Sequence, residues 1–189
     1  MKLFTRLFTL AIMFMPIIVL AHGAPRLKVE ETIIIKAAPA DVWNAIKNFD
    51  DIHSWHPAIE STKASGNENG ATRTLTLGNG GTIEETLKKL DNEKMVMNYQ
   101  ITSMSNAGDI DDHGAPHEVP VVPVSKYKAW LSVKADAEGS KVSWKGKFFR
   151  AYHGHQNVPP KELDDNAAKS AISGIYKAGL ENLKTQLEK

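Results

Sequence analysis

The sequence predicts an α+β fold, in which a curved antiparallel sheet of about six to seven strands surrounds one long C-terminal helix. Between residues 28 and 150, most segments alternate apolar and polar residues, as strands do when one face is buried. From about Pro160 to Glu188, apolar residues recur with a helical period instead. Two glycines inside that helix, Gly174 and Gly179, suggest a close approach of its backbone to a neighbour, or space left for a ligand.

The first 21 residues have the pattern of an export signal. Lys2 and Arg6 make the start basic, an apolar stretch runs from Leu7 to Leu20, and the small residue Ala21 fits a cleavage site. The stretch is short for a membrane span and Pro16 interrupts it, although an uncleaved anchor is the alternative. We therefore expect a periplasmic protein, with secretion as the alternative, that has three parts: a cleaved signal peptide (1–21), a flexible arm (22–27) and a single domain (28–189).

The composition argues against several classes of function. The chain has no cysteine, so it has no disulfide, thiol nucleophile or zinc–thiolate site. Its 23 basic and 22 acidic residues give a formal charge of +1. Removal of Lys2 and Arg6 with the signal leaves 21 basic residues against 22 acidic ones, a charge of −1. Such balance argues against a nucleic-acid-binding protein, which needs a net basic stripe.

The segment from residue 29 to residue 57 shows how the domain begins. A strand-like run over residues 29–35 leads to Ala37-Ala38-Pro39, and the fixed φ of proline suits the first turn of a helix. Apolar residues then recur on one helical face, at Val42, Ile46 and Phe49. A second break precedes Trp55-His56-Pro57. We therefore expect two short helices after the first strand.

Glycine-rich and polar turns divide the rest of the chain into strands. The expected strands cover about residues 59–63, 72–77, 82–90, 95–101, 126–135 and 141–150. Residues 103–124 contain three prolines and two glycines and are expected to form an extended loop. A second loop, rich in histidine, is expected over residues 152–160.

Ala38-Pro39, Val42-Trp43, Trp55 and Pro57 give the chain a family resemblance. The pattern resembles the start of the SRPBCC superfamily, which includes Bet v 1, START-related and polyketide cyclase-like proteins. By order of elements, the resemblance extends over about residues 28–188. It implies the helix-grip fold, with a ligand cavity between the curved sheet and the helix. It does not choose among carriers, cyclases and accessory proteins.

Strand and helix periodicity, together with this resemblance, places a set of side chains at the expected cavity, although they could instead pack together and leave no space. Arg73 and Glu85 share the parity of their apolar neighbours, so they could form a buried ion pair. The rarity of buried charges favours the alternative, in which both lie in water near the sheet edge. The expected pocket residues are Trp55 near its mouth, Arg73, Leu75, Glu85, Leu87, Met97, Tyr99, Tyr127, Trp144, Phe148, Ile172 and Tyr176.

Histidines in the predicted loops raise the possibility of a metal site. His113 and His117 are four residues apart and Asp109 is close in sequence, but Pro116 disfavours the helix that such a spacing needs. His22, at the expected mature N-terminus, could bind copper only with two further nitrogen donors. There is no H-E-x-x-H and no EF-hand spacing. We expect solvated loops, with neither metal nor cofactor.

The sequence contains no diagnostic catalytic motif, since it lacks both cysteine and a G-x-S-x-G turn. Glu85, Asp51 and His56 could form an acid–base site, but their spacing does not require it. An enzyme of the cyclase or dehydratase type is therefore an alternative, without predicted catalytic residues. A carrier of a small apolar or aromatic ligand is another alternative.

A closer resemblance covers nearly the whole mature chain. The leader, His22-Gly23, Trp55-His56-Pro57-Ala58 and the run from Gly70 to Leu77 are similar to the MxaD-type proteins encoded with bacterial methanol oxidation. This resemblance implies a periplasmic, non-enzymatic accessory protein that assists methanol dehydrogenase, through its maturation or its contact with a c-type cytochrome. The acidic loop over residues 109–118 and the loop at His153 are the parts expected to reach such a partner.

Overall fold

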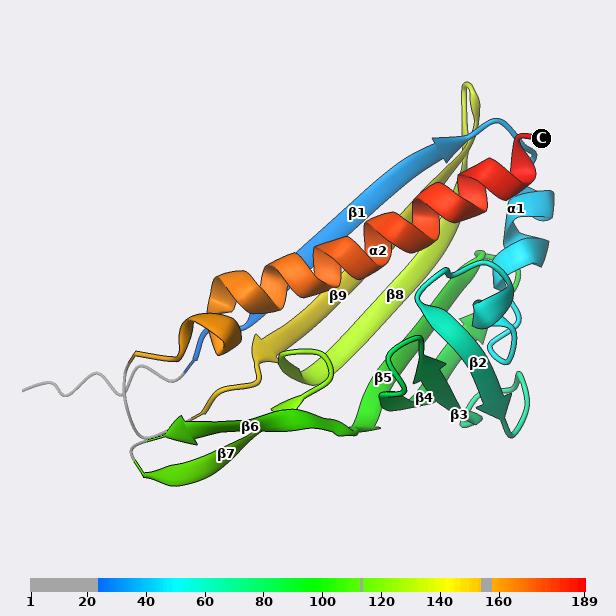
Figure 1. Cartoon of the computed structure of the whole chain (residues 1–189). Helices are drawn as coiled ribbons and strands as arrows, with labels where there is room; N and C mark the ends of the chain where they lie inside the picture. The colour runs from blue at the N-terminus through cyan, green and yellow to red at the C-terminus, as the bar shows by residue number, and fades with distance from the viewer. Residues whose placement is uncertain (1–23, 113, 154–157) are drawn as a thin grey trace, which may run out of the picture.

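A computed structural model describes residues 24–112, 114–153 and 158–189. One face of a seven-stranded antiparallel sheet packs against a long helix, which confirms the predicted helix-grip fold (Figure 1). The strands are β1 (Leu27–Ile35), β2 (Ile59–Ala64), β3 (Thr72–Leu77), β4 (Thr82–Asp91), β5 (Val96–Met104), β6 (Asn106–Asp112), β7 (Ala115–Pro120), β8 (Val124–Asp136) and β9 (Gly139–Arg150). The helices are α1 (Pro39–Ile46), η1 (Ile52–Ser54), η2 (Lys161–Leu163) and α2 (Asp165–Leu187).

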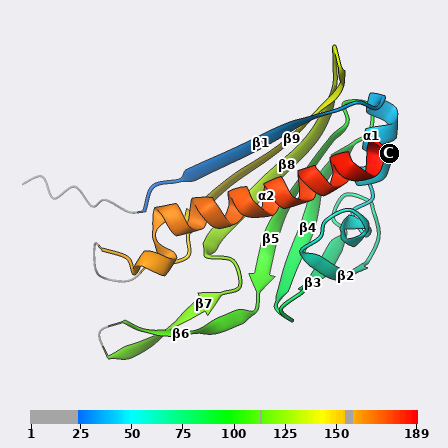
Figure 2. The ribbon, with the colours of Figure 1, turned by 45° about the horizontal axis from the view of Figure 1, so that its top comes forward.

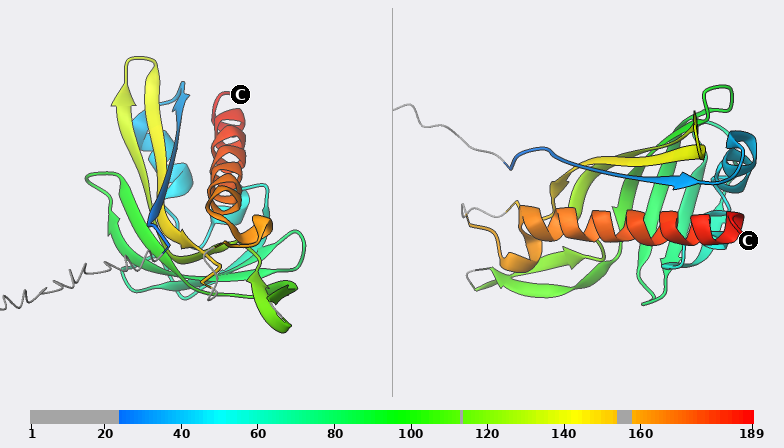
Figure 3. Two further views of the ribbon diagram at one scale, coloured as in Figure 1. Left: turned by 90° about the vertical axis from the view of Figure 1, so that its left-hand side faces the viewer. Right: turned by 90° about the horizontal axis from the view of Figure 1, so that it is seen from above.

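The sheet has the strand order β1-β9-β8-β5-β4-β3-β2, so the first and last strands in sequence lie side by side. The sheet bends around α2, which runs over its inner face (Figures 2 and 3). The segment with α1 and η1 carries the chain from β1, at one sheet edge, to β2, at the other. β1 begins at Leu27, one residue before the expected domain start, and the expected signal peptide lies outside the described residues.

Helix α2 begins later than its apolar pattern suggests. Residues 161–163 form a 3₁₀ turn, and Asp164 then caps the helix by accepting a hydrogen bond from the backbone N–H of Ala167 at 2.7 Å. Its buried face contains Ala168, Ile172, Tyr176, Gly179, Leu180 and Leu183. Among the described residues, no helix is long and apolar enough to span a bilayer.

The core lies between α2 and the inward residues of the two longest strands. Alternate positions on β8 and β9 are buried, as expected for strands with one face in the core: Tyr127, Ala129, Leu131, Val133, Val142, Trp144 and Phe148. Trp144 stacks on Tyr176 of α2 with ring centres 4.4 Å apart, which joins the sheet to the helix directly.

The expected loop over residues 103–124 is wrong in part, because β6 and β7 form a separate two-stranded ribbon. Asp111 accepts a hydrogen bond from the backbone N–H of Gly114 at 2.6 Å, which stabilises the turn between the strands. Most of the ribbon side chains are exposed, so neither strand shows the alternation of a core strand. Its prolines are tolerated because the ribbon consists of two edge strands.

Candidate ligand cavity

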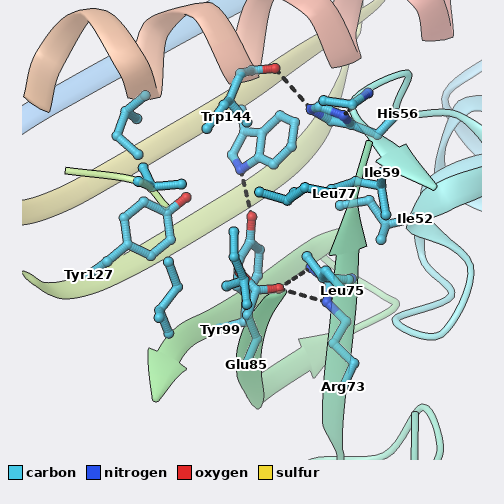
Figure 4. Close-up of a pocket in the computed structure, with 16 residues that line it drawn as sticks. Ile52, His56, Ile59, Arg73, Leu75, Leu77, Glu85, Tyr99, Tyr127 and Trp144 are labelled. Atoms are coloured by element: carbon cyan, nitrogen blue, oxygen red, sulfur yellow. Dashed lines mark hydrogen bonds and ion pairs between the residues drawn. The ribbon is translucent and has the colours of Figure 1, made fainter. Parts of the chain in front are cut away.

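A small cavity lies between the inner face of the sheet and α2 (Figure 4). Its volume is about 50 Å³. Seven of the predicted pocket residues line it: Arg73, Leu75, Glu85, Tyr99, Tyr127, Trp144 and Ile172. The remaining lining residues are Ile52, His56, Ala58, Ile59, Leu77, Ile83, Ile101, Val122 and Ile175. The space therefore has mostly aliphatic walls and a few polar groups.

The sheet register places Arg73 of β3 directly opposite Glu85 of β4. Their side chains form a buried ion pair, since the residues are only 3% and 4% exposed. Nε and Nη2 of Arg73 both donate to Oε2 of Glu85, at 2.7 and 2.6 Å. The expectation that both would lie in water is therefore wrong. Burial is tolerated because each charge has its partner on the neighbouring strand.

Two further contacts hold the guanidinium of Arg73 in the core. Its Nη1 donates a hydrogen bond to the backbone oxygen of Phe49 at 2.8 Å. The guanidinium carbon also lies 4.0 Å from the ring centre of Phe49 and 5.0 Å from that of Tyr99, within cation–π range. Burial raises the pKa of the Glu85 carboxyl, and the charge of Arg73 opposes that rise. Arg73 and Glu85 are thus the strongest polar feature of the cavity wall.

Hydroxyl groups form a second polar feature. Nε1 of Trp144 donates to the hydroxyl of Tyr99 at 2.9 Å, and the hydroxyls of Tyr127 and Tyr176 are 2.5 Å apart. Burial raises the pKa of all three tyrosines above its ordinary value, so they stay neutral near pH 7. As neutral hydroxyl groups they can donate and accept hydrogen bonds.

His56 has both ring nitrogens engaged. Its Nδ1 accepts from the backbone N–H of Ala58 at 3.2 Å, so Nε2–H must be the donor to the backbone oxygen of Ile175 at 2.9 Å. Burial lowers the pKa of His56, which favours this neutral tautomer.

Asp51 lies beside His53 and not beside His56, with 3.6 Å between its Oδ1 and the Nδ1 of His53. The suggested acid–base set of Glu85, Asp51 and His56 is therefore not assembled in the cavity wall.

Five predicted pocket residues do not line the cavity: Trp55, Leu87, Met97, Phe148 and Tyr176. They are buried around it and build the core instead. Trp55 was expected near the mouth, but it is 3% exposed and its ring packs 5.5 Å from that of Trp144. His56 is a lining residue that was not expected, because its position between Trp55 and Pro57 does not show that its side chain turns toward α2.

The described residues contain no group of three histidine, aspartate or glutamate side chains close enough to hold a metal ion. The ring of His117 packs against Tyr152, with ring centres 5.1 Å apart. Asp109 accepts a hydrogen bond from Asn106 at 3.1 Å. His22 and His113, the other candidates, lie outside the described residues.

The arrangement of a curved sheet, a C-terminal helix and a cavity between them occurs in known proteins. A family model described as polyketide cyclase/dehydrase and lipid transport matches residues 26–188. The chain belongs to this family. Membership supports the SRPBCC, Bet v 1-like resemblance and is consistent with a small apolar ligand. It does not distinguish the MxaD-type subgroup from other members.

Solved structures extend the comparison. The protein XoxI from Bacillus cereus is 26% identical, with a TM-score of 0.65, and the match covers 86% of this chain and 94% of that one. An uncharacterised protein from Bacillus thuringiensis is 24% identical, with a TM-score of 0.65 and coverage of 87% and 100%. Major latex-like protein 151 from Panax ginseng is 11% identical, with a TM-score of 0.63 and coverage of 87% and 99%. At such low identity, the last two similarities show the fold alone. No curated protein matches the chain.

Proposed function

We propose that this protein is a carrier that encloses a small apolar or aromatic ligand between the sheet and α2. The observation that carries the proposal is the buried Arg73–Glu85 pair in the wall of a mostly apolar cavity. Ligand pockets are typically apolar, with a few convergent polar groups. Arg73 donates twice to Oε2 of Glu85, and no hydrogen bond from the described residues reaches Oε1. This oxygen is therefore an acceptor for a hydroxyl or amine of the ligand.

The cavity must widen to hold such a ligand. Its volume of about 50 Å³ is smaller than the ~150 Å³ of an apolar cavity that binds benzene. Leu77, Ile101 and Ile175 line the cavity and are only partly buried, which indicates the side on which it approaches the surface. Their aliphatic side chains can change rotamer without breaking a hydrogen bond. We therefore expect a ligand to enter by displacing these side chains.

Two measurements test the carrier proposal. Native mass spectrometry of the gently purified protein should detect a bound small molecule. N-phenylnaphthylamine, an aromatic amine that fluoresces in apolar surroundings, should bind to the empty protein and compete with that molecule. Ile172→Phe, which adds bulk to the cavity wall, should weaken binding of the dye by about tenfold or more.

Leu183→Phe is the matched control, because Leu183 is buried on the same helix but does not line the cavity. It should leave the affinity for the dye unchanged, provided that near-UV circular dichroism shows native packing in both variants. An empty protein that does not bind the dye contradicts the carrier proposal. Equal weakening by both variants also contradicts it, because the dye would then bind elsewhere.

A second candidate is the accessory role in methanol oxidation, carried out in the periplasm after cleavage behind Ala21. Its support is the similarity to MxaD-type proteins, together with the ribbon of β6 and β7, which extends beyond the main sheet (Figure 1). This ribbon presents exposed carboxylates at Asp109, Asp111 and Glu118. Exposed loops and ribbons on a rigid scaffold often form the contact with a partner protein.

Affinity purification from periplasm tests this role. The wild-type protein should enrich methanol dehydrogenase or a c-type cytochrome, and its measured mass should correspond to a chain that begins at His22. Neutralising the ribbon with Asp109→Asn, Asp111→Asn and Glu118→Gln should reduce that enrichment. The control neutralises three exposed carboxylates elsewhere, Glu60, Glu84 and Glu181, and should not. Absence of both partners from the enriched fraction contradicts the accessory role.

A further inference from the structure

The outer face of β1, β9 and β8 carries a dense group of cations. Alternation along β1 places Glu31 toward α2, where it accepts a hydrogen bond from Ser173, and turns Lys28 the other way. The sheet register aligns Lys28 with Lys147 of β9, and Lys147 with Lys128 of β8, in one row across three strands. We call this surface the basic face and define it by Arg26, Lys28, Lys126, Lys128, Lys145, Lys147, Trp130 and Phe149.

Two partly exposed aromatic rings lie among these cations. The ammonium groups of Lys145 and Lys147 lie 6.0 and 5.9 Å from the centre of the Trp130 ring. Arg26 and Lys126 lie 5.8 and 5.9 Å from the centre of the Phe149 ring. Phe149, Lys126 and Arg26 also line a surface groove of about 340 Å³. The face therefore combines positive charge with amphipathic aromatic surface.

Acidic residues scarcely interrupt this charge. Among the described residues, Glu30 is the carboxylate that lies between these cations. Its Oε2 is 2.7 Å from Nζ of Lys28, and its Oε1 accepts a hydrogen bond from the hydroxyl of Ser143 at 3.1 Å. The hydrogen bond from Lys28 is the main cause that lowers the pKa of Glu30. Asp136 and Glu138 lie farther along, at the turn between β8 and β9. The basic face thus keeps a clear positive excess.

We infer that the basic face docks the protein onto a bilayer that contains anionic phospholipids. Lysines near an anionic membrane each strengthen binding, and tryptophan is favoured at the bilayer interface. A specific protein partner fits less well, since protein interfaces are depleted of lysine and enriched in arginine. Because cations beside an aromatic ring can also bind single-stranded nucleic acid, the vesicle test must be accompanied by a test of nucleic-acid binding. The inference goes beyond ligand binding and stands whether or not the cavity takes a ligand.

The groove gives this docking surface a connection to the interior. Lys126 has a φ of 48° at a bulge in β8, where pairing with β9 shifts register between Ser125 and Lys128. Bulges of this kind redirect side chains. Pairing of β5 with β8 ends at Gln100 and Lys128, and the next residues, Ile101 and Tyr127, line both the groove and the cavity. Docking would therefore bring the bilayer to a groove that shares Ile101 and Tyr127 with the cavity.

Binding to vesicles tests the inference. Co-sedimentation should show binding to vesicles of phosphatidylglycerol mixed with phosphatidylcholine, weaker binding as salt is added, and little binding to pure phosphatidylcholine. The triple variant Lys28→Gln, Lys128→Gln, Lys147→Gln removes the aligned row and should weaken binding by on the order of 100-fold, about fivefold per lysine. The control Lys63→Gln, Lys161→Gln, Lys169→Gln changes the net charge equally at exposed sites outside the face and should weaken it far less.

All of these proteins should carry the same N-terminus, verified by mass, so that any contribution of the N-terminal segment to vesicle binding cancels.

Trp130 gives an independent readout, because the chain has four tryptophans and Trp43, Trp55 and Trp144 are buried. Vesicles should shift the fluorescence to the blue in the wild type but not in Trp130→Phe. Equal binding of the two triple variants overturns the inference. So does binding to nucleic acid or to an acidic protein without binding to anionic vesicles.

Discussion

Arg73 and Glu85 show how one residue pair can be both a structural cost and a candidate recognition element. The buried guanidinium of Arg73 donates two hydrogen bonds to one carboxylate oxygen of Glu85 and a third to a backbone carbonyl. It also lies within cation–π range of two aromatic rings. Such a pair often adds little net stability compared with apolar residues, whereas removal of one partner leaves an uncompensated charge. Loss of one partner should therefore destabilise the protein more than replacement of both by apolar residues.

The first prediction separates these two effects. Glu85→Leu should lower the free energy of unfolding by about 3–5 kcal/mol, because Arg73 is then buried without its partner. The double variant Arg73→Leu, Glu85→Leu should recover most of that loss, since no charge is left in the core. Urea denaturation at pH 7 measures four proteins: the wild type, the two single variants Arg73→Leu and Glu85→Leu, and the double variant. If the double variant is as unstable as the sum of the two single variants, the pair is not coupled and this account of it is wrong.

Strand parity pointed both residues toward the core, and the structure confirms that direction. The prediction failed at the next step, because the general rarity of buried charges was given more weight than the pairing of Arg73 with Glu85 across the hairpin. Phe49 completes the site from 24 residues away in sequence, and no local pattern could have indicated its carbonyl. Parity thus predicts which face a residue occupies, while its partners depend on tertiary contacts.

At the scale of elements, α2 is positioned by close contact at one glycine. A Cβ atom built on Gly179 would lie 2.5 Å from Cδ2 of His56 and 3.0 Å from Cζ3 of Trp144. Gly174, on the same helix, is exposed, and a Cβ atom there would meet nothing within 4 Å. The sequence suggested a close approach at both glycines, but only Gly179 makes one. The helical period of the apolar residues did not show which of the two glycines contacts a neighbouring element.

The second prediction compares these two glycines. Gly179→Ala should destabilise the protein by about 1–3 kcal/mol, because the methyl group forces His56 or α2 to move. Gly174→Ala should stabilise it by up to about 1 kcal/mol, because alanine favours the helix and meets open space. Chemical denaturation measures both changes. Equal stabilisation by the two substitutions would mean that α2 does not pack against His56 as described.

Strands with one buried face were predictable, and β3 matches its expected bounds of 72–77. The ribbon of β6 and β7 was missed, because it covers no core and so carries no apolar alternation. Its strands are held by pairing with each other and by the turn at Asp111 and Gly114. Alternation of apolar and polar residues arises when one face of a strand is buried, so it does not indicate a strand that is exposed on both faces.

At the scale of the whole molecule, balanced composition conceals an uneven distribution of charge. The formal charge of the whole chain is only +1. Pairing of β1 with β9 brings Lys28 into a row with Lys128 and Lys147, residues about 100 positions away in sequence. The inner face of the same strands is apolar and forms the core. One sheet therefore separates the cavity from a charged surface, and neither can be recognised from the composition and net charge of the chain.

The third prediction concerns the stability of the whole protein in acid. Burial lowers the pKa of His56 in the folded state, whereas a histidine in the unfolded chain titrates near about 6.5. Above that pH neither state is protonated, and the contribution of His56 to stability is fully present. As the pH falls, the unfolded chain binds a proton that the folded protein excludes, so stability is lost until the folded pKa is reached.

His56→Gln removes this titration, so its unfolding free energy should depend less on pH below about 6.5, by up to about 1.4 kcal/mol per pH unit. Comparison of the two proteins by denaturation from pH 8 to pH 5 cancels the contributions of Glu85 and the other shared groups. The ring resonances of His56, followed by NMR over the same range, should independently show its lowered pKa. Parallel stability curves would mean that the neutral ring between Ala58 and Ile175 is not required for the fold.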